Sequence, residues 1–294
     1  MPGNVAILIL GVFACSTAVI MIRLSELNPI LLSSYRLLVA AMLLLPLFLR
    51  DYRASGGKQS LWSLFTRALV PGLFLGAHFI FWIVGARKTP STNSSLVVNM
   101  VPVVMPFCLY LLSRERLNRW EYAGTALSVA GLAVLAGTDL NLSADYFAGD
   151  AFCLVSMLLL AVYLALARRN SSGSTLWLYL VPVYLIGGLF CLACGFAFAG
   201  PLDGISGSDA LYVLGLAAVP TVVGHTSMNY CMRKMRGQAV AIAGLGQFVF
   251  AGILAYFILK EIPSIMFYPA SVLVVVGSVI AIRFGPKTVQ ADSL

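Results

Sequence analysis

Residues 5–22 read VAILILGVFACSTAVIMI, a stretch without a charged side chain. An α-helix needs about 20 mostly apolar residues to cross the hydrocarbon core of a bilayer. The stretch therefore predicts a membrane-spanning helix. The residues before it, Met1 to Asn4, lack the basic segment of a signal peptide, so we expect this helix to remain in the mature chain.

Apolar stretches of this length recur along the 294 residues, which are 60% hydrophobic and 10% charged, with a mean hydropathy of +0.94. Soluble domains are about 25% charged. Because charged side chains are too few here to cover a water-facing surface, a soluble enzyme, a nucleic-acid-binding protein and a disordered chain are poor fits. The sequence predicts an all-α integral membrane protein with ten spans, at residues 5–22, 30–49, 67–86, 94–112, 120–137, 150–168, 175–198, 209–231, 238–258 and 265–284.

The basic residues, which give the chain a net charge of +8, lie mostly in the breaks between these spans. If the N-terminus is inside, the outer loops hold only Arg23, Arg87, Lys88 and Lys260 of the 19 lysines and arginines, and Arg36 lies within a span. The other 14 fall in inner segments. Because cytoplasmic segments carry the excess of lysine and arginine, both termini are predicted to be cytoplasmic.

The two halves of the chain align with each other at an offset of 146 residues. The matched pairs are Tyr110 with Tyr256, Arg114 with Lys260, Glu115 with Glu261, Tyr122 with Tyr268, Gly131 with Gly277, and Arg87-Lys88 with Arg233-Lys234. Residues 1–140 and 146–285 would then form two repeats of five helices, followed by a short polar tail at 286–294. Because five is odd, the second repeat would enter the membrane with the opposite sense.

Inverted repeats allow a central site to open alternately to the two faces of a membrane. Such a repeat is typical of a secondary transporter, whereas a channel or a membrane enzyme does not need it. The alternative is that duplication only produced a stable helical bundle. Both halves of the site would lie in one chain, which makes function as a monomer plausible.

The first half also contains the pattern Pro106-x8-Glu115-x8-Gly124-x6-Gly131. This pattern resembles the first EamA repeat of the drug/metabolite transporter superfamily. The second half echoes it through Glu261 and Gly277, with Ala270 where the family often has a second glycine. The resemblance covers nearly the whole chain, and the layout of five plus five helices is similar as well.

Within that superfamily, the sequence most resembles the bacterial aromatic amino-acid exporters of the YddG type. The resemblance implies a multi-pass exporter of the bacterial inner membrane that moves aromatic and other neutral amino acids, and related metabolites, by alternating access. It also implies a central cavity lined mainly by spans 1, 3, 4, 6, 8 and 9. The implied partners are the lipid bilayer and a small-molecule substrate, and we expect no nucleic acid and no cofactor.

Two histidines within predicted spans are candidates for the substrate site. His78 has Trp82 four residues further on, and His225 has Asn229 at the same spacing. Residues i and i+4 share one face of a helix, so each histidine would present a neighbour to the same ligand. The functional interpretation is a site that binds a zwitterion or relays a proton. The alternative is a neutral histidine that bonds between helices.

Four further residues complete the predicted substrate site. Arg36 could pair with a substrate carboxylate, or it could snorkel to the interface or stabilise helix packing. Asn99 and Gln247 occupy broadly corresponding positions in the two halves, and their amides could bond an amino acid without a buried charge. Tyr163, like Trp82, could stack on an aromatic substrate.

Prolines and glycines within spans predict where helices bend or approach closely. Pro102 and Pro106 follow Asn99 and would permit a bend beside a candidate site residue. The pair Gly72 and Gly76 is spaced for close helix packing. The predicted hinge and packing positions are Gly72, Gly76, Pro102, Pro106, Gly244 and Gly246.

Other functions lack residues that they would need. A proton-coupled exporter of cationic drugs would carry an acid deep in a span, and none is visible. A carrier of phosphorylated sugars or nucleotide derivatives would need several basic residues, and only Arg36 qualifies. Export of drugs or such metabolites remains the alternative. A membrane enzyme would need an oriented base or a metal cluster, so we expect no catalytic residue and no metal.

Overall fold

The computed structural model describes residues 2–89, 91–139, 144–170, 173–198, 206–260 and 262–286. Within these ranges the chain is helical apart from turns and short connections, and it contains no strand. Its elements are α1 (Pro2–Ser16), α2 (Ala18–Leu24), α3 (Pro29–Ala54), α4 (Leu61–Lys88), α5 (Ser91–Val98), α6 (Val101–Ser113), α7 (Arg119–Asp139), α8 (Phe147–Arg169), α9 (Leu176–Phe198), α10 (Gly207–Leu216), the π-helix η1 (Ala217–His225), α11 (Thr226–Lys234), α12 (Gly237–Gly244), α13 (Gly246–Leu259) and α14 (Phe267–Phe284).

Nine helical segments of the described chain are long and apolar enough to cross a membrane. The fifth predicted span, 120–137, corresponds to α7, a helix of 21 residues that falls outside those nine and packs along α14. The all-α prediction is confirmed. Glu261 and residues 287–294, which include most of the predicted tail, lie outside the described residues.

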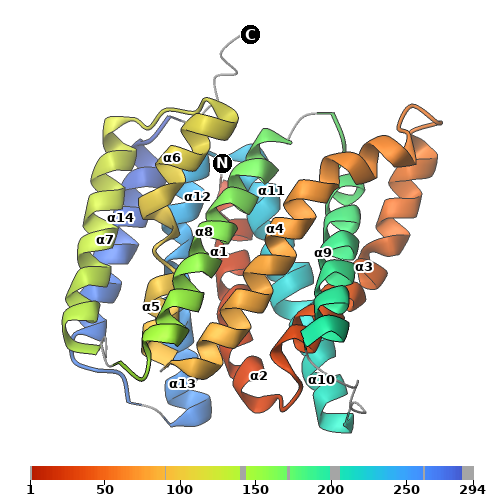
Figure 1. The fold of residues 1–294 in the computed structure, drawn as a ribbon. Helices are drawn as coiled ribbons and strands as arrows, with labels where there is room; N and C mark the ends of the chain where they lie inside the picture. Colours follow the sequence, from red (N-terminus) through yellow and green to blue (C-terminus); the bar gives the residue numbers. More distant parts are fainter. Residues whose placement is uncertain are drawn as a thin grey trace.

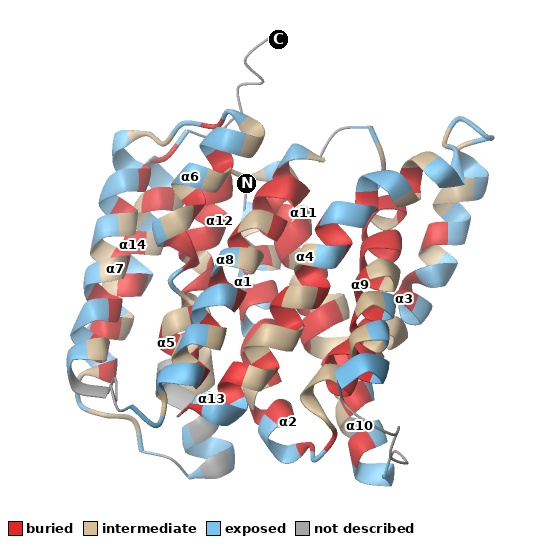
Figure 2. Ribbon diagram, viewed as in Figure 1, coloured by how far each residue is buried: buried red, intermediate tan, exposed pale blue. Residues whose placement is uncertain are grey.

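The helices form a bundle in which α7 and α14 lie on one side and α3 and α9 on the other (Figure 1). Helices α1, α4, α8 and α11 lie between these pairs. Buried residues follow the helix faces that turn toward the middle of the bundle, and exposed apolar residues cover its outside (Figure 2). Asn4 and Pro286 line one common pocket, so both ends of the described chain lie at the same end of the bundle.

The connection between the second and third spans is shorter than residues 50–66, which the predicted spans leave between them. Helix α3 continues to Ala54, and α4 already begins at Leu61. Near the end of α3, Arg50 forms an ion pair of 2.9 Å with the adjacent Asp51. Tyr52 also stacks on Phe48 with 6.0 Å between ring centroids. Phe48 and Tyr52 are four residues apart and share one helix face, so their contact supports the helix beyond its apolar part.

Glycines bring two pairs of helices into backbone contact. A Cβ added at Gly76 of α4 would lie 2.7 Å from the carbonyl oxygen of Gly187 in α9. At the other side of the bundle, a Cβ at Gly124 of α7 would lie 2.6 Å from the carbonyl oxygen of Gly277 in α14. Gly131, further along α7, meets the carbonyl oxygen of Ala270, earlier in α14, so these two helices run antiparallel.

Within the described residues, four of the ten predicted spans are interrupted near their middle. The first breaks at Thr17, between α1 and α2, and the fourth breaks at Asn99 and Met100, between α5 and α6. The ninth breaks at Leu245, between α12 and α13, and the eighth contains the π-helix η1. Irregular backbone within a membrane occurs where it is buried in protein or lines a cavity, so these breaks mark the region to examine for a site.

Candidate functional site

A small cavity of about 60 Å³ lies where these interrupted helices meet. That volume corresponds to about two water molecules. Of the eight predicted substrate-binding residues, six line it: Arg36, His78, Trp82, Asn99, His225 and Gln247. The other lining residues are Cys15, Ala18, Val98, Leu160, Leu164, Pro220 and Met228. The lining comes from spans 1, 3, 4, 6, 8 and 9, which the family resemblance implied, and from span 2 through Arg36.

Arg36 is fully buried in α3 and is held by two unlike contacts. Its Nε and Nη2 donate hydrogen bonds to Oγ1 of Thr221, at 3.1 and 2.9 Å. Its Cζ lies 4.0 Å from the centroid of the Phe79 ring, which is a cation–π contact. None of the ion pairs in the described part of the chain includes Arg36, and its Nη1 has no hydrogen-bond partner there.

The π-helix explains why Thr221 can hold this guanidinium. Pro220 has no N–H, so it cannot donate a hydrogen bond to a carbonyl in the preceding turn. Oγ1 of Thr221 donates to the carbonyl oxygen of Leu216 at 2.7 Å. With its proton used there, the same oxygen accepts both bonds from Arg36. Such π-helical turns are frequent at functional sites.

His78 is fixed by a reciprocal pair of hydrogen bonds with Ser156 of α8. Its Nδ1 lies 3.0 Å from the carbonyl oxygen and 2.8 Å from Oγ of Ser156. Oγ of Ser156 donates in turn to the carbonyl oxygen of His78 at 3.1 Å. Nδ1 is thus committed to α8, and Nε2 is the ring nitrogen left for a ligand.

Aromatic rings continue from His78 along the wall of the cavity. The Trp82 ring stacks on His78 with an interplanar angle of 7° and 6.1 Å between centroids. The sequence spacing predicted this shared face. Phe79 contacts His225 edge-on at 5.1 Å, so the two histidines approach one ring from different helices.

Asn99 and Gln247 both lie at helix breaks. Asn99 follows the end of α5, and its Nδ2 donates to the carbonyl oxygen of Ser95 at 2.7 Å. Gln247 lies in the first turn of α13, directly after the break at Leu245. The predicted glycines flank this break: a Cβ at Gly244 would lie 3.8 Å from Nε2 of Gln247, and one at Gly246 would lie 3.2 Å from Val12.

Tyr163 and Asn229 do not line the cavity. Both are fully buried, and Nδ2 of Asn229 donates to the Tyr163 hydroxyl and to the carbonyl oxygen of His225, each at 2.7 Å. The pair joins α8 to α11 directly behind the cavity wall. Their predicted contact with substrate stays a prediction, whereas their present contacts support helix packing.

The bend in the fourth crossing is anchored to the second half of the chain. Pro106 cannot donate to the carbonyl oxygen of Pro102, four residues earlier. Nε2 of Gln238 in α12 donates to that oxygen at 3.0 Å and to Oγ1 of Thr125 at 2.8 Å. Pro106 therefore leaves the carbonyl oxygen of Pro102 without its helical donor, and Gln238 of α12 donates to it instead.

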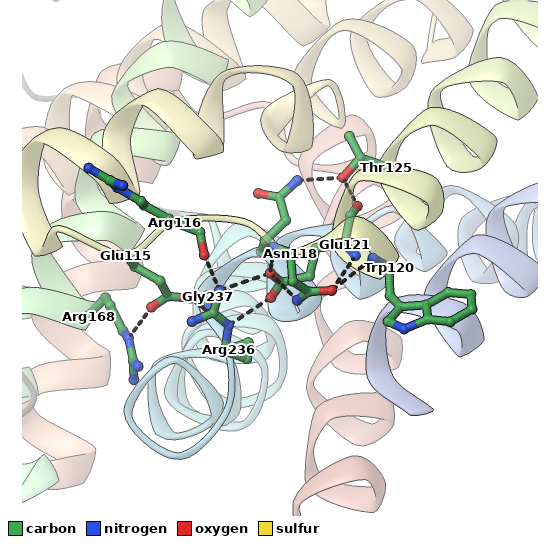
Figure 3. A network of polar contacts seen from close by, with 10 residues as sticks. Glu115, Arg116, Asn118, Trp120, Glu121, Thr125, Arg168, Arg236 and Gly237 are labelled. Carbon is green, nitrogen blue, oxygen red and sulfur yellow. Dashed lines mark hydrogen bonds and ion pairs between the residues drawn. The ribbon is translucent and has the colours of Figure 1, made fainter. Parts of the chain in front are cut away.

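A charged network joins four elements at one end of the bundle (Figure 3). Glu115, after α6, pairs with Arg168 of α8 at 2.8 Å and with Arg236 at 3.3 Å. Arg236, which precedes α12, pairs with Glu121 of α7 at 2.9 Å. The backbone N–H of Gly237 also donates to Oε1 of Glu115 at 3.0 Å.

The charge of Arg236 is stabilised by this network. Burial alone would lower the pKa of Arg236, but its hydrogen bond to Glu121 and the charges of Glu115 and Glu121 raise it above the usual value. Nη2 of Arg236 donates to the carbonyl oxygen of Arg116 as well. Arg236 therefore stays ionised over the physiological range, and its ion pairs persist there.

Polar contacts also join helices at the opposite end. Oδ1 of Asp209 in α10 accepts hydrogen bonds from Oγ of Ser25 at 2.8 Å and from the N–H of Glu26 at 3.1 Å. Arg87, at the end of α4, donates to the carbonyl oxygens of Leu27 and Ser25 at 2.7 and 2.8 Å. The cavity thus lies between two sets of polar contacts.

A larger groove of about 790 Å³ lies between α6 and α7. Its walls include Phe107 and Tyr122, which are 70% and 61% exposed on the outside of the bundle. Large apolar side chains on the outside of a helical membrane bundle are typical of a surface that faces lipid. The candidate site is therefore the smaller central cavity, where the buried polar groups converge.

Several residues of the site were not singled out as binding residues from the sequence. Thr221 holds Arg36, Phe79 stacks against it, and Cys15 and Met228 complete the cavity wall. The only local signal was the threonine directly after Pro220, which is suited to bond a carbonyl that a proline leaves free. Phe79, Cys15 and Met228 look like ordinary apolar residues of a span.

Comparisons with known proteins agree with this architecture. The chain is 26% identical over 274 residues to an uncharacterized transporter of Archaeoglobus fulgidus, covering 90% of this chain and 92% of that protein. It is 23% identical over 237 residues to an uncharacterized transporter of Synechocystis sp., covering 78% of this chain and 66% of that protein.

A crystal structure with 19% sequence identity superposes with a TM-score of 0.77 over 97% of this chain and 98% of that one, which shows a shared fold. A sequence model of the EamA-like transporter family matches residues 1–137 and again residues 147–283. The two matches cover most of the chain. The protein is a multi-pass membrane transporter and belongs to the EamA-like transporter family.

Proposed function

We propose that this chain is a secondary transporter that exports amino acids, aromatic and other neutral ones, across a bacterial inner membrane by alternating access through the central cavity. The observation that carries the proposal is the convergence of polar and aromatic residues from separate helices on one cavity. Arg36, His78, Trp82, Asn99, His225 and Gln247 lie there, next to interruptions of the helices.

The chemistry of the cavity suits an amino acid. The guanidinium of Arg36 can pair with a carboxylate, and the amide oxygens of Asn99 and Gln247 can accept hydrogen bonds from an ammonium group. The stacked rings of His78 and Trp82 offer a flat apolar wall to an aromatic side chain. A cavity of about 60 Å³ is smaller than any of these substrates, so binding requires the interrupted helices to move apart.

Packing between the halves supports the inverted repeat on which alternating access depends. At the repeat offset of 146 residues, Gly124 corresponds to Ala270, and Gly277 corresponds to Gly131. Gly124 contacts Gly277, and the corresponding residues Ala270 and Gly131 contact each other as well. Other helix pairs exchange in the same way. At the same offset, α4 corresponds to η1 with the helices beside it, α8 corresponds to α1, and α9 corresponds to α3. Helix α4 packs on α8 and α9, and its counterpart η1 packs on their counterparts α1 and α3.

Counterflow into liposomes that contain only the purified protein tests the proposal. Labelled phenylalanine, tryptophan, alanine and lysine are compared, with and without an imposed pH gradient. We expect saturable counterflow of the three neutral amino acids. Absence of movement of all four, in protein shown to be folded, would contradict the amino-acid assignment. Acceleration by the gradient would identify a proton-coupled carrier and leave the substrate assignment intact.

A further inference from the structure

We infer that the central cavity recognises a carboxylate and does not require an amino group, so that monocarboxylates without an ammonium group are substrates and amines without a carboxylate are not. The inference rests on the proposed transport function and specifies its substrate class. Three kinds of observation support the inference. They are two unpartnered donors, the charge of the lining residues, and the way in which Arg36 is held.

The first observation is that the buried guanidinium of Arg36 has too few hydrogen-bond acceptors among the described residues. Its side chain is fully buried and permanently charged. Thr221 satisfies Nε and Nη2, and the ring of Phe79 covers the guanidinium, but Nη1 has no acceptor among the described residues. A buried charge is stable only when it is paired and hydrogen-bonded. A ligand oxygen that carries negative charge supplies both requirements at once.

The second observation is another unpartnered donor on the same cavity. Trp82 lines the cavity, and its indole Nε1 is buried without a hydrogen-bond partner in the described chain. An indole N–H can only donate, and so can a guanidinium. Arg36 and Trp82 therefore both require an acceptor. An ammonium group brings three donors and no acceptor, so it can satisfy neither of them.

The third observation is the charge of the lining. Among the described residues that line the cavity, none is an aspartate or glutamate, and Arg36 is the one residue with a permanent charge. In a low-dielectric interior, charges interact strongly over short distances. The cavity therefore attracts an anion and repels a cation. An amino acid is accepted through its carboxylate, while its ammonium group meets only neutral amides and imidazoles.

The orientation of Arg36 makes this selectivity specific. Its Nε edge is fixed to Thr221, and Thr221 is fixed to the carbonyl oxygen of Leu216 by a 2.7 Å bond. The guanidinium cannot easily turn away to another acceptor, so the atom left for the ligand is Nη1. A lysine at this position would carry the same charge, but it would lack the planar edge whose Nε and Nη2 donate to Thr221.

Inhibition of phenylalanine counterflow by its analogues tests the inference. 3-Phenylpropanoate lacks the ammonium group, and 2-phenylethylamine lacks the carboxylate. We expect 3-phenylpropanoate to inhibit within about threefold of phenylalanine, and 2-phenylethylamine to be at least about tenfold weaker, because it loses the charge-assisted hydrogen bonds to Arg36. Labelled 3-phenylpropanoate should itself show saturable counterflow.

Matched variants link the selectivity to its residues. In Arg36→Gln, the preference for 3-phenylpropanoate over 2-phenylethylamine should disappear, whereas the exposed Arg50→Gln should retain it. Arg36→Gln could fail to fold, so Trp82→Phe serves as a second variant that removes the indole donor, keeps an aromatic ring and should reduce the preference at least about threefold. Trp120→Phe is its control, because Trp120 lies far from the cavity lining beside Phe284.

Thermal stabilisation of the detergent-solubilised protein gives a readout that is independent of transport. Stabilisation by 3-phenylpropanoate and not by 2-phenylethylamine supports the inference. Equal potency of the two analogues, with phenylalanine still transported, overturns the inference and leaves the proposed function standing. Movement of 3-phenylpropanoate without movement of any amino acid supports the carboxylate site and removes the amino-acid assignment. Absence of both transport and stabilisation overturns both.

Discussion

Nε of Arg168 lies 2.8 Å from Oε2 of Glu115, and both side chains are almost completely buried. Glu115 belongs to the first stretch matched by the family model, and Arg168 belongs to the second. Their ion pair therefore holds the two halves of the transporter together at one end. Arg168 also donates to the carbonyl oxygen of Met232 at 2.8 Å, so α8 is tied to α11 at the same point.

Replacement of Glu115 by glutamine should destabilise the protein, because it leaves the buried guanidinium of Arg168 without its counter-charge. Breaking one partner of a buried ion pair costs about 3–5 kcal/mol. We expect a clearly lower thermal midpoint in detergent. Glu26→Gln is the matched control, since the exposed Glu26 side chain is in none of the described ion pairs. Equal midpoints for the two variants would show that the pair adds no stability.

Gly76→Ala should disturb the packing of α4 on α9, since the new Cβ would lie 2.7 Å from the carbonyl oxygen of Gly187. Overpacking of this kind costs about 1–3 kcal/mol, and the thermal midpoint should fall. Gly137→Ala is the control, because no atom lies within 4 Å of its added Cβ. Alanine is the better helix former, so this control should match or exceed the wild-type midpoint.

Pro106→Ala and Gln238→Leu should be strongly coupled. In the wild type, Gln238→Leu leaves the carbonyl oxygen of Pro102 unpaired, at a cost of about 1–3 kcal/mol. In the Pro106→Ala background, the new N–H at position 106 can bond that oxygen, so Gln238→Leu should cost less. Thermal midpoints of the two single variants and the double variant measure this coupling. Additive effects would contradict the assigned role of Gln238.

Transport should be more sensitive to Trp82 and His78 than to Trp120. Trp82→Phe and His78→Ala remove groups from the cavity wall, where stacking and hydrogen bonds contribute about 0.5–1.5 kcal/mol each. Counterflow affinity should fall roughly threefold to tenfold. Trp120 instead packs against Arg119 and Phe284 at the bundle end. Equal losses in all three variants would count against the cavity as the transport site.

Cysteines introduced at opposite ends of the bundle should differ in accessibility. Lys58, between α3 and α4, and Ser208, at the start of α10, are both exposed. With both termini cytoplasmic, a membrane-impermeant maleimide added to intact cells should label Ser208→Cys and not Lys58→Cys. The wild-type chain, whose six cysteines lie in apolar segments, controls for background labelling. The reverse pattern would invert the assigned orientation.

Much of the fold could be predicted from local sequence. Apolar stretches bounded by charged residues located most span ends within three residues, because crossing a bilayer imposes a length and a composition on one continuous segment. The end of the second span and the start of the third were less accurate, since α3 continues to Ala54 and α4 begins at Leu61. In the polar end of α3, Tyr52 stacks on Phe48 one turn earlier, and hydropathy does not reveal this contact.

The candidate site could be predicted only in part. Polar and aromatic residues at membrane depth are rare enough to be conspicuous, and six of the eight chosen residues surround one cavity. Tyr163 and Asn229 were equally conspicuous, yet they bond to each other at 2.7 Å behind the cavity wall. Depth in a span can be read from sequence, whereas the direction of a side chain depends on how the helix is rotated against its neighbours.

Local composition was thus sufficient to establish a helical membrane protein with few buried charges, because the bilayer acts on each segment separately. The role of Arg36 required the tertiary structure. Its partner Thr221 lies 185 residues away in the chain, and that threonine is positioned by a π-helix that no periodicity reveals. Whether a buried charge is satisfied depends on atoms contributed by distant segments, and only their packing shows that Nη1 of Arg36 has no hydrogen-bond partner among the described residues.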